Sequence, residues 1–260
     1  MAGRPGAGIG CRRRGGCVRE GKCEMVQFLT SYRLYLILAV ATVFGYLWLS
    51  QCKKRLCLKE WMAFVLAVCH TVVGVLCVKL FAFLESGSGG MSLYGAVFFL
   101  PIVYYAFAKI AKRDTADVFD VFTICTITTL LCARFNCILA DCCLGAIIPG
   151  TDGMRWPTRT AEIVFYVVLY IFLRKKVGNK TYRGKIYPIY ALAYGVFRFI
   201  VEFFRESEMT FGWFHISHLW STVAVIASAA AMYAINKHYK RDNMKTNKKN
   251  GKQAEGRIVK

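Results

Sequence analysis

Residues 61–84 read WMAFVLAVCHTVVGVLCVKLFAFL, a continuous apolar stretch in which Lys79 is the one permanently charged residue. The hydrocarbon core of a bilayer is about 30 Å thick and requires roughly 20 apolar residues of α-helix to cross it. A helix satisfies its own backbone N–H and C=O groups, which lipid cannot do. This stretch therefore predicts a helix that spans a membrane.

Six further apolar stretches follow the same pattern, and polar or basic segments separate them. Hydrophobic residues make up 56% of the chain, charged residues 19%, and the mean hydropathy is +0.40, whereas soluble proteins carry about 25% charged residues. The sequence predicts an all-α integral membrane protein with about seven transmembrane helices. The expected spans are 32–49, 61–84, 92–110, 121–147, 161–173, 186–204 and 218–235.

The basic residues predict the orientation. They are concentrated at 53–59, 109–113, 174–185 and in the tail, whereas the segment 85–90 has none. Cytoplasmic loops carry an excess of lysine and arginine, so we expect the C-terminus in the cytoplasm and the N-terminus outside.

The predicted organisation has three parts, of which the first differs in character from the rest. We expect a basic leader and external tail at 1–30, a seven-helix membrane domain at 31–236 and a basic cytoplasmic tail at 237–260. The six basic residues of segment 1–24 would instead favour a cytoplasmic N-terminus, and the leader contains no apolar h-region of the kind found in a signal peptide. We therefore hypothesise that translation starts at Met25.

The net charge of +20 does not predict a nucleic-acid partner. The basic residues lie beside the predicted spans, where they contact anionic lipid headgroups. The twelve cysteines do not predict a metal site either, because many lie in apolar stretches, where cysteine behaves as a small hydrophobe. Cys11, Cys17 and Cys23 lack a CxxC pair and a nearby histidine. We expect membrane lipids as partners, and no metal, cofactor or nucleic acid.

Ionisable residues inside a membrane are costly and mark functional sites. The stretch YGVFRFIVEFFRE, residues 194–206, places Tyr194, Arg198, Glu202 and Arg205 along one helical stripe. Glu202 can orient the guanidinium of Arg198, whose planar and permanently charged donors suit a phosphate. The alternative is a buried ion pair that only fixes the packing of the helix.

Two other stretches carry candidate site residues. In ARFNCILADCCLG, residues 133–145, Arg134 lies within a predicted span and Asp141 returns to nearly the same helical face. A purely structural arginine–aspartate pair is the alternative. In GGMSLYGA, residues 89–96, the glycines permit close backbone approach and Tyr94 presents a phenol, with an ordinary interfacial tyrosine as the alternative. The expected topology gathers these residues in the outer half, where two arginines suit an anionic lipid headgroup.

These stretches resemble, in order and spacing, the motifs of the prolipoprotein diacylglyceryl transferase family. Residues 194–206 are similar to its Y-G-x-x-R-x-x-x-E-x-x-R helix, 89–96 to its G-G-x-S-x-H-G-G stretch, 133–145 to its G-R-x-G-N-x-x-N-G-E-x-x-G signature, and WPTRTAE at 156–162 to its H-P-x-Q-L-Y-E loop. The resemblance covers roughly residue 74 to the end of the seventh span. It implies a bacterial cell-membrane enzyme that moves the diacylglyceryl group of phosphatidylglycerol to the lipobox cysteine of prolipoproteins.

The resemblance also implies roles for individual residues. Tyr94, Arg198 and Glu202 are the expected catalytic residues, with Arg198 on the phosphate and Glu202 as its acidic partner. Tyr94 stands where the family has a histidine and is expected to accept a proton or donate a hydrogen bond. The substrate-binding residues implied are Arg134, Asn136, Asp141 and Tyr194, of which Asn136 and Asp141 each stand one position before the family's residue.

Two other functions compete with this interpretation. The first is a non-catalytic binder or transporter of anionic phospholipid built on the same scaffold. The second, an intramembrane protease, is disfavoured because His70, His215 and His218 accompany no recognisable serine nucleophile motif. His218 opens the seventh predicted span near the outer site and is the alternative candidate for the base.

Overall fold

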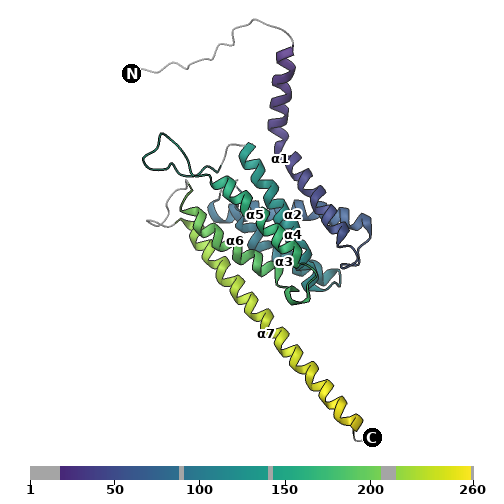
Figure 1. The fold of residues 1–260 in the computed structure, drawn as a ribbon. Helices are drawn as coiled ribbons and strands as arrows, with labels where there is room; N and C mark the ends of the chain where they lie inside the picture. Colours follow the sequence, from purple (N-terminus) through teal and green to yellow (C-terminus); the bar gives the residue numbers. More distant parts are fainter. Residues whose placement is uncertain (1–17, 88–90, 140–142, 206–214, 259–260) are drawn as a thin grey trace. The chain divides into compact units, whose positions relative to one another are not determined.

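The computed structural model describes residues 18–87, 91–139, 143–205 and 215–258. The chain divides into two units, residues 1–36 and 37–260, which are described separately. Within the described ranges the secondary structure is helical, apart from two isolated β-bridges (Figure 1). The elements are α1 (Val18–Gln51), α2 (Glu60–Ser86), α3 (Tyr94–Ile110), α4 (Thr115–Leu139), α5 (Thr158–Lys176), the short 3-10 helix η1 (Lys180–Tyr182), α6 (Ile186–Glu202) and α7 (Ile216–Ile258).

Each predicted span overlaps one of the seven α-helices, so the prediction of an all-α membrane protein is confirmed. Among the residues that the structure describes, four helical segments are long and apolar enough to cross a membrane, and α3 is a shorter apolar helix. The four segments are Tyr32–Gln51, Glu60–Glu85, Thr115–Leu139 and Ile216–Arg241. The predicted fifth span, 161–173, lies within the longer helix α5. The orientation of the termini stays a prediction.

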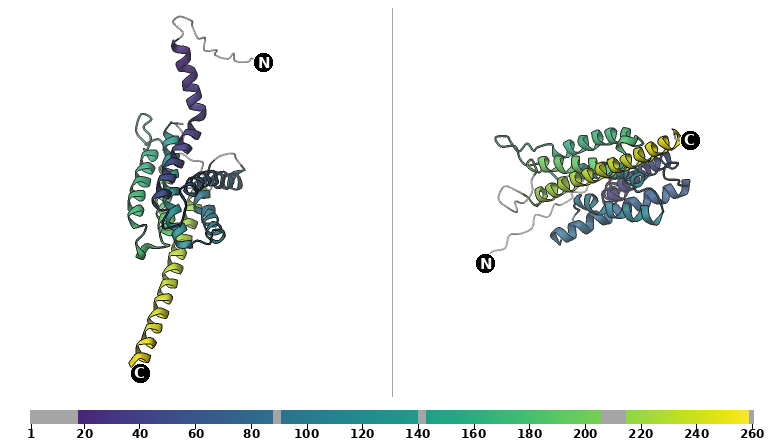
Figure 2. Two further views of the ribbon diagram at one scale, coloured as in Figure 1. Left: turned by 90° about the vertical axis from the view of Figure 1, so that its right-hand side faces the viewer. Right: turned by 90° about the horizontal axis from the view of Figure 1, so that it is seen from below.

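The second unit is a bundle in which α4 is central (Figures 1 and 2). Helix α4 contacts α2, α3, α5 and α6, while α6 also packs along α7. Polar side chains join the helices where they cross: the indole of Trp48 donates to the Val121 carbonyl at 3.0 Å, and the Tyr187 hydroxyl donates to the Val97 carbonyl at 2.6 Å. Such bonds satisfy carbonyl oxygens and fix helix register inside an apolar core.

Helices α2 and α3 approach each other closely at Gly95. A Cβ atom at this position would lie 2.2 Å from the Cys77 carbonyl oxygen and 2.8 Å from the Phe81 Cβ. Only glycine leaves room for such a contact between two backbones. Gly95 belongs to the stretch 89–96, whose glycines were predicted to permit close approach, and its contact sets the position of Tyr94 at the start of α3. Residues 88–90 lie outside the described ranges.

The prediction for the fourth span was wrong at its C-terminal end. Helix α4 begins at Thr115 and ends at Leu139, whereas the apolar pattern predicted 121–147. Residues 143–157 instead form an extended loop in which Ile147 bridges to Arg155. A Cβ atom on Gly145 would lie 2.1 Å from the Trp156 carbonyl oxygen, so this crossing of two backbone segments requires glycine and is incompatible with a continuing helix.

At the opposite end of α4 a buried carboxylate connects two parts of the chain. Asp120 accepts hydrogen bonds from the backbone N–H groups of Gly184, at 2.9 and 3.1 Å, and of Ile186, at 3.3 Å. Arg55 lies 3.4 Å from the same carboxylate. Asp120 therefore caps the start of α6 from another helix, in place of a capping side chain within α6 itself.

Candidate functional site

One end of the bundle gathers the ionisable residues that the sequence predicts as a site. Helices α4 and α6 end there, while α3, α5 and α7 begin there, because consecutive helices run in alternate directions. Tyr94 is the first residue of α3 and Glu202 the last residue of α6, and Arg134 lies near the end of α4. The helix ends that carry these residues therefore lie at the same end of the second unit, as the course of the helices in Figure 1 shows.

Four charged side chains form a continuous chain of ion pairs at this end. Arg134 Nε lies 2.7 Å from Glu162 Oε2, and Arg198 Nη1 lies 2.8 Å from Glu162 Oε1. Arg198 Nη2 lies 3.0 Å from Glu202 Oε2. All four residues are buried, with 7% or less of each exposed. Glu162 thus holds two arginines from different helices on its two oxygens, and Glu202 holds the second of them.

This chain of ion pairs explains how two arginines are tolerated in the interior. A buried charge is strongly unfavourable unless a partner and further hydrogen bonds compensate it. Two carboxylates oppose the two guanidinium groups of Arg134 and Arg198. Each guanidinium has five N–H donors in a rigid plane, more than these ion pairs use. The arrangement is therefore suited to binding an anion such as a phosphate.

The Tyr94 hydroxyl connects α3 to the start of α7. It donates to the Ser217 carbonyl at 2.8 Å and lies 2.7 Å from the Ser221 hydroxyl oxygen. The ring of Tyr194 packs edge-on against Tyr94, with 5.8 Å between centroids. The Tyr194 hydroxyl is buried one turn before Arg198 and has no hydrogen-bond partner among the described residues. It is a polar group that a ligand at this end could satisfy.

Two histidines stand at the start of α7 in different surroundings. Nδ1 of His215 lies 3.8 Å from Glu202 Oε1. His218 is buried, with its ring against Phe199 and Phe203 at centroid distances of 4.9 and 4.5 Å, and its Nδ1 accepts the backbone N–H of His215 at 3.1 Å. The sequence suggested His218 as an alternative base, whereas the structure places His215 against the acidic residue of the site.

Not every predicted site residue joins this group. Arg205 was expected on the stripe of Arg198 and Glu202, but α6 ends at Glu202 and Arg205 pairs with Gly145 in an isolated bridge, so the four-residue stripe was wrong at its last member. Asn136 follows Arg134 by two residues and therefore faces another side of α4. Its Oδ1 is buried without a hydrogen bond in the described part of the chain. Asp141 lies outside the described residues.

Glu162 belongs to the candidate site, although the sequence analysis did not predict it as a site residue. It lies in the first turns of α5, inside the stretch WPTRTAE that was recognised only as a similar loop. The signal was present, because a lone glutamate directly before the apolar run IVFYVVLYIF is an intramembrane carboxylate. Its partners could not be identified from a local pattern, since Arg198 follows it by 36 residues.

The extended loop before α5 lies beside the ion-pair chain. Ala146 N–H donates to the Phe204 carbonyl at 2.9 Å, and the ring of Trp156 packs on that of Phe204 at 4.9 Å. Arg159 donates to the Cys137 carbonyl at 3.4 Å, which ties the start of α5 to the end of α4. The loop therefore holds together the helix ends that carry Arg134, Glu162 and Glu202.

Comparison with known proteins bears on this site. A family model described as prolipoprotein diacylglyceryl transferase matches residues 25–234. Three relatives named phosphatidylglycerol–prolipoprotein diacylglyceryl transferase are similar to the chain. The protein of Pasteurella multocida is 29% identical over 159 residues, which cover 55% of this chain and 59% of the relative. The protein of Ehrlichia canis is 27% identical over 146 residues, which cover 50% of this chain and 55% of the relative. The protein of Treponema pallidum is 28% identical over 110 residues, which cover 35% of this chain and 33% of the relative. These matches span from about a third to three fifths of the relatives' length.

Proposed function

Because the chain belongs to the prolipoprotein diacylglyceryl transferase family, we propose that it transfers the diacylglyceryl group of phosphatidylglycerol to the cysteine thiol of a prolipoprotein lipobox. The observation that carries the proposal is the pair of buried arginines, Arg134 and Arg198, held on the single carboxylate of Glu162. Positive charge fixed in advance in a site of low dielectric stabilises charge that develops during a reaction.

In the proposed reaction the cysteine sulfur attacks the glycerol carbon that bears the phosphate. A carbon–sulfur bond forms and the carbon–oxygen bond to the phosphate breaks, so the electron pair remains on the departing glycerol phosphate. Arg134 and Arg198 bind this phosphate before and after its departure, when its negative charge increases. Glu202 orients Arg198 through the contact at 3.0 Å. The two substrates supply all the reacting atoms, and the proposal uses no cofactor.

The reaction also needs a group that takes the proton of the thiol, because the thiolate is the nucleophile. The Tyr94 hydroxyl donates to the Ser217 carbonyl, so we assign Tyr94 the role of a hydrogen-bond donor that holds the start of α7. His215 is the proposed proton acceptor, because its Nδ1 faces Glu202 and a carboxylate there stabilises the imidazolium that forms.

The proposal has a topological part as well. The basic loops predict that the end carrying Arg134 and Arg198 faces the outside of the cell membrane of a bacterium. A donor lipid then enters from the outer leaflet, and the lipobox segment of a prolipoprotein approaches from the same side. Tyr194, whose buried hydroxyl has no partner in the described residues, is available to the bound headgroup.

The test is a transfer assay with the full chain in nanodiscs. The donor is phosphatidylglycerol labelled in the diacylglyceryl part, and the acceptor is a lipobox peptide with one cysteine. We expect a labelled thioether product together with an equal amount of released glycerol phosphate, and no product from a peptide with serine in place of cysteine. Restoration of lipoprotein maturation in bacteria depleted of their own transferase would be the corresponding result in cells.

A non-catalytic lipid-binding protein is the second candidate. It is favoured by one observation, namely that the arginines are already compensated by Glu162 and Glu202 and so form a stable structural unit. Binding of phosphatidylglycerol without any thioether product, under conditions where a relative from the same family is active, would decide for this candidate and against the transferase.

A further inference from the structure

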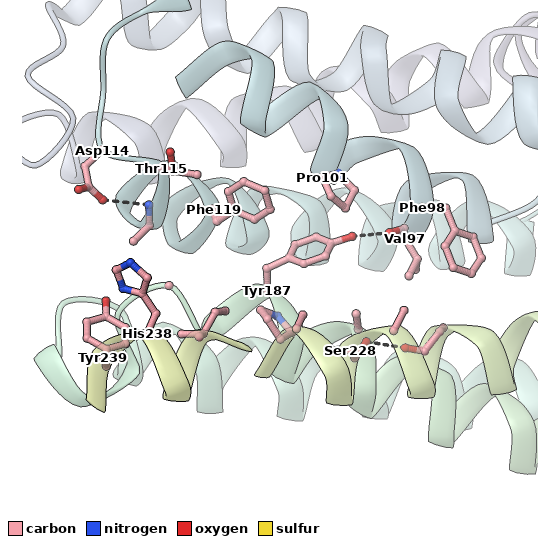
Figure 3. Close-up of a pocket in the computed structure, with 18 residues that line it drawn as sticks. Val97, Phe98, Pro101, Asp114, Thr115, Phe119, Tyr187, Ser228, His238 and Tyr239 are labelled. Atoms are coloured by element: carbon pink, nitrogen blue, oxygen red, sulfur yellow. Dashed lines mark hydrogen bonds between the residues drawn. The ribbon is translucent and has the colours of Figure 1, made fainter. Parts of the chain in front are cut away.

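An apolar groove runs along α7 on the side that faces α3 and the start of α4 (Figure 3). Its volume is about 650 Å³. Small side chains of α7, including Ala224, Ala227 and Ala231, form one wall, and the aromatic rings of Phe98 and Phe119 contribute to the other. Larger residues on α7 would fill this space, so the alanines keep the groove open.

The groove is long and narrow. Ala224 and Tyr239 line its two ends and are separated by about 22 Å of helix at 1.5 Å per residue. A helix with its side chains is about 10 Å wide. An extended alkyl chain is far thinner than a helix. The shape therefore suits a single lipid tail.

The polarity of the groove changes from one end to the other. His238 and Tyr239 of α7 lie at one end, together with Asp114 and Thr115 at the start of α4, whereas Phe98 lies at the apolar end (Figure 3). A phospholipid has the same profile, with a polar headgroup and a long apolar tail. The groove thus matches a phospholipid in its length and in the order of its polar and apolar ends.

The polar end of the groove is basic. Nζ of Lys185 lies 5.8 Å from the ring centroid of Tyr239, and residues 237–241 read KHYKR. The Asp114 carboxylate is paired with Arg183 at 3.4 Å. An excess of positive charge remains, and lysine and arginine near an anionic lipid surface attract its headgroups. The headgroup favoured at this end is anionic.

We propose that the groove binds an acyl chain of an anionic phospholipid whose headgroup lies beside Lys185 and His238. This end of the bundle is opposite to the candidate transfer site, so in the predicted topology the bound lipid comes from the inner leaflet. One leaflet contributes about 15 Å of hydrocarbon, and a tail that follows the groove of about 22 Å reaches past the midplane. Its end lies near Phe98, whose ring stacks on Tyr94 at 6.4 Å.

The test uses the full chain in nanodiscs of phosphatidylcholine with a minority of phosphatidylglycerol that carries a photoactivatable group at the end of one acyl chain. Irradiation should attach this lipid to the apolar end of the groove, at Phe98, Pro101 or Ala224, as mapped by mass spectrometry of peptides. Ala227→Trp should abolish the attachment by filling the groove, whereas the matched variant Ala229→Trp, on an exposed part of α7 that does not line the groove, should preserve it.

A second variant tests the headgroup without changing the groove's shape. Lys185→Gln should lower the attachment of the phosphatidylglycerol probe severalfold and leave that of a phosphatidylcholine probe unchanged. Attachment at Phe119 or Ile235 would place the headgroup at the opposite end and overturn the proposal, as would equal attachment in the parent and Ala227→Trp. These measurements record lipid attachment and not transfer, so their outcome is independent of the proposed transferase activity.

Discussion

Glu162 binds Arg134 and Arg198 at the same time, through oxygen-to-nitrogen distances of 2.7 and 2.8 Å. The three residues come from α5, α4 and α6. One carboxylate therefore determines the separation of two guanidinium groups and aligns three helix ends. The spacing of the N–H donors that an anion would meet therefore depends on Glu162 as well as on the two arginines.

Replacement of Glu162 by glutamine should destabilise the protein and abolish phospholipid binding at this end. The glutamine amide has the volume of the glutamate carboxylate but lacks the negative charge that two buried guanidinium groups share. Removal of one partner of a buried ion pair lowers the free energy of unfolding by roughly 3–5 kcal/mol. Thermal unfolding in detergent would measure the first effect. Cross-linking of a headgroup-labelled phosphatidylglycerol to this end of the bundle, mapped by mass spectrometry, would measure the second. Glu85→Gln is the matched control, because Glu85 makes no ion pair among the described residues. Equal behaviour of the two variants would contradict the role of Glu162.

Replacement of either arginine by lysine should weaken phosphatidylglycerol binding although the charge is kept. Arg198 uses Nη1 for Glu162 and Nη2 for Glu202, and a lysine ammonium cannot reproduce two donors in one plane. The measurement is cross-linking of a headgroup-labelled phosphatidylglycerol to this end of the bundle, with the chain reconstituted in nanodiscs and the attachment mapped by mass spectrometry. Arg174→Lys, on the exposed end of α5, is the control. If Arg134→Lys and Arg198→Lys both bound lipid as well as the parent, the proposed grip on the phosphate would be refuted.

The roles proposed for His215 and Tyr94 predict different losses of transfer. His215→Gln should lower the rate by roughly 10²–10⁴, as expected for loss of an acid–base group. Tyr94→Phe removes a hydrogen bond worth about 0.5–1.5 kcal/mol and should lower the rate by about tenfold or less. Initial rates with labelled phosphatidylglycerol and a lipobox peptide distinguish the two. A larger loss in Tyr94→Phe than in His215→Gln would transfer the role of proton acceptor to Tyr94.

The contact between α2 and α3 predicts a contrast between two glycines. Gly95→Ala should destabilise the protein, because its Cβ would meet the Cys77 carbonyl oxygen at 2.2 Å. Gly74→Ala should be neutral or stabilising by about 0.5–1 kcal/mol, since an added Cβ meets nothing within 4 Å and alanine favours the helix. Melting temperatures of both variants in one detergent provide the comparison, and an equal or higher value for Gly95→Ala would show that the close approach is not required.

Two cysteines in the loop between α1 and α2 test the predicted topology. Cys57 is exposed, whereas burial raises the pKa of the Cys52 thiol to about 11. A membrane-impermeant maleimide should label Cys57 in inverted vesicles and not in intact cells. Cys52 should stay unlabelled near neutral pH, because its thiolate does not form there. Reporters fused after Lys185 and within 87–89 should read cytoplasmic and external, and the reverse pattern would invert the placement of the site.

The helices and one ion pair could be predicted from the sequence because both follow from local patterns. Long apolar runs indicate spans regardless of their neighbours, and each of them corresponds to a helix. The pairing of Arg198 with Glu202 follows from their spacing of four residues on one helix, and the structure has it at 3.0 Å. In both cases the information lies within one element.

The remaining features depend on contacts between distant segments. The backbone at Gly145 crosses Trp156 where the apolar pattern predicted a continuing helix, and no local pattern indicates this crossing. The attachment of Arg134 to Glu162 requires that α4 and α5 are neighbours, and the position of His215 requires that α7 begins beside the end of α6. Such relationships follow from the packing of the helices and not from the spacing of residues.

The capping of α6 by Asp120 also has a consequence for the order of biosynthesis. Gly184, whose N–H the carboxylate accepts, leaves the ribosome 64 residues after Asp120, a delay of roughly 3–13 s at about 5–20 residues per second. Arg55 precedes Asp120 by 65 residues and is present from the start. During this interval Arg55 and Asp120 have been synthesised, whereas Gly184 and Ile186, whose N–H groups Asp120 accepts, have not. The nascent α6 therefore meets a prepared acceptor for its first N–H groups, which favours its docking at the correct depth as soon as it emerges.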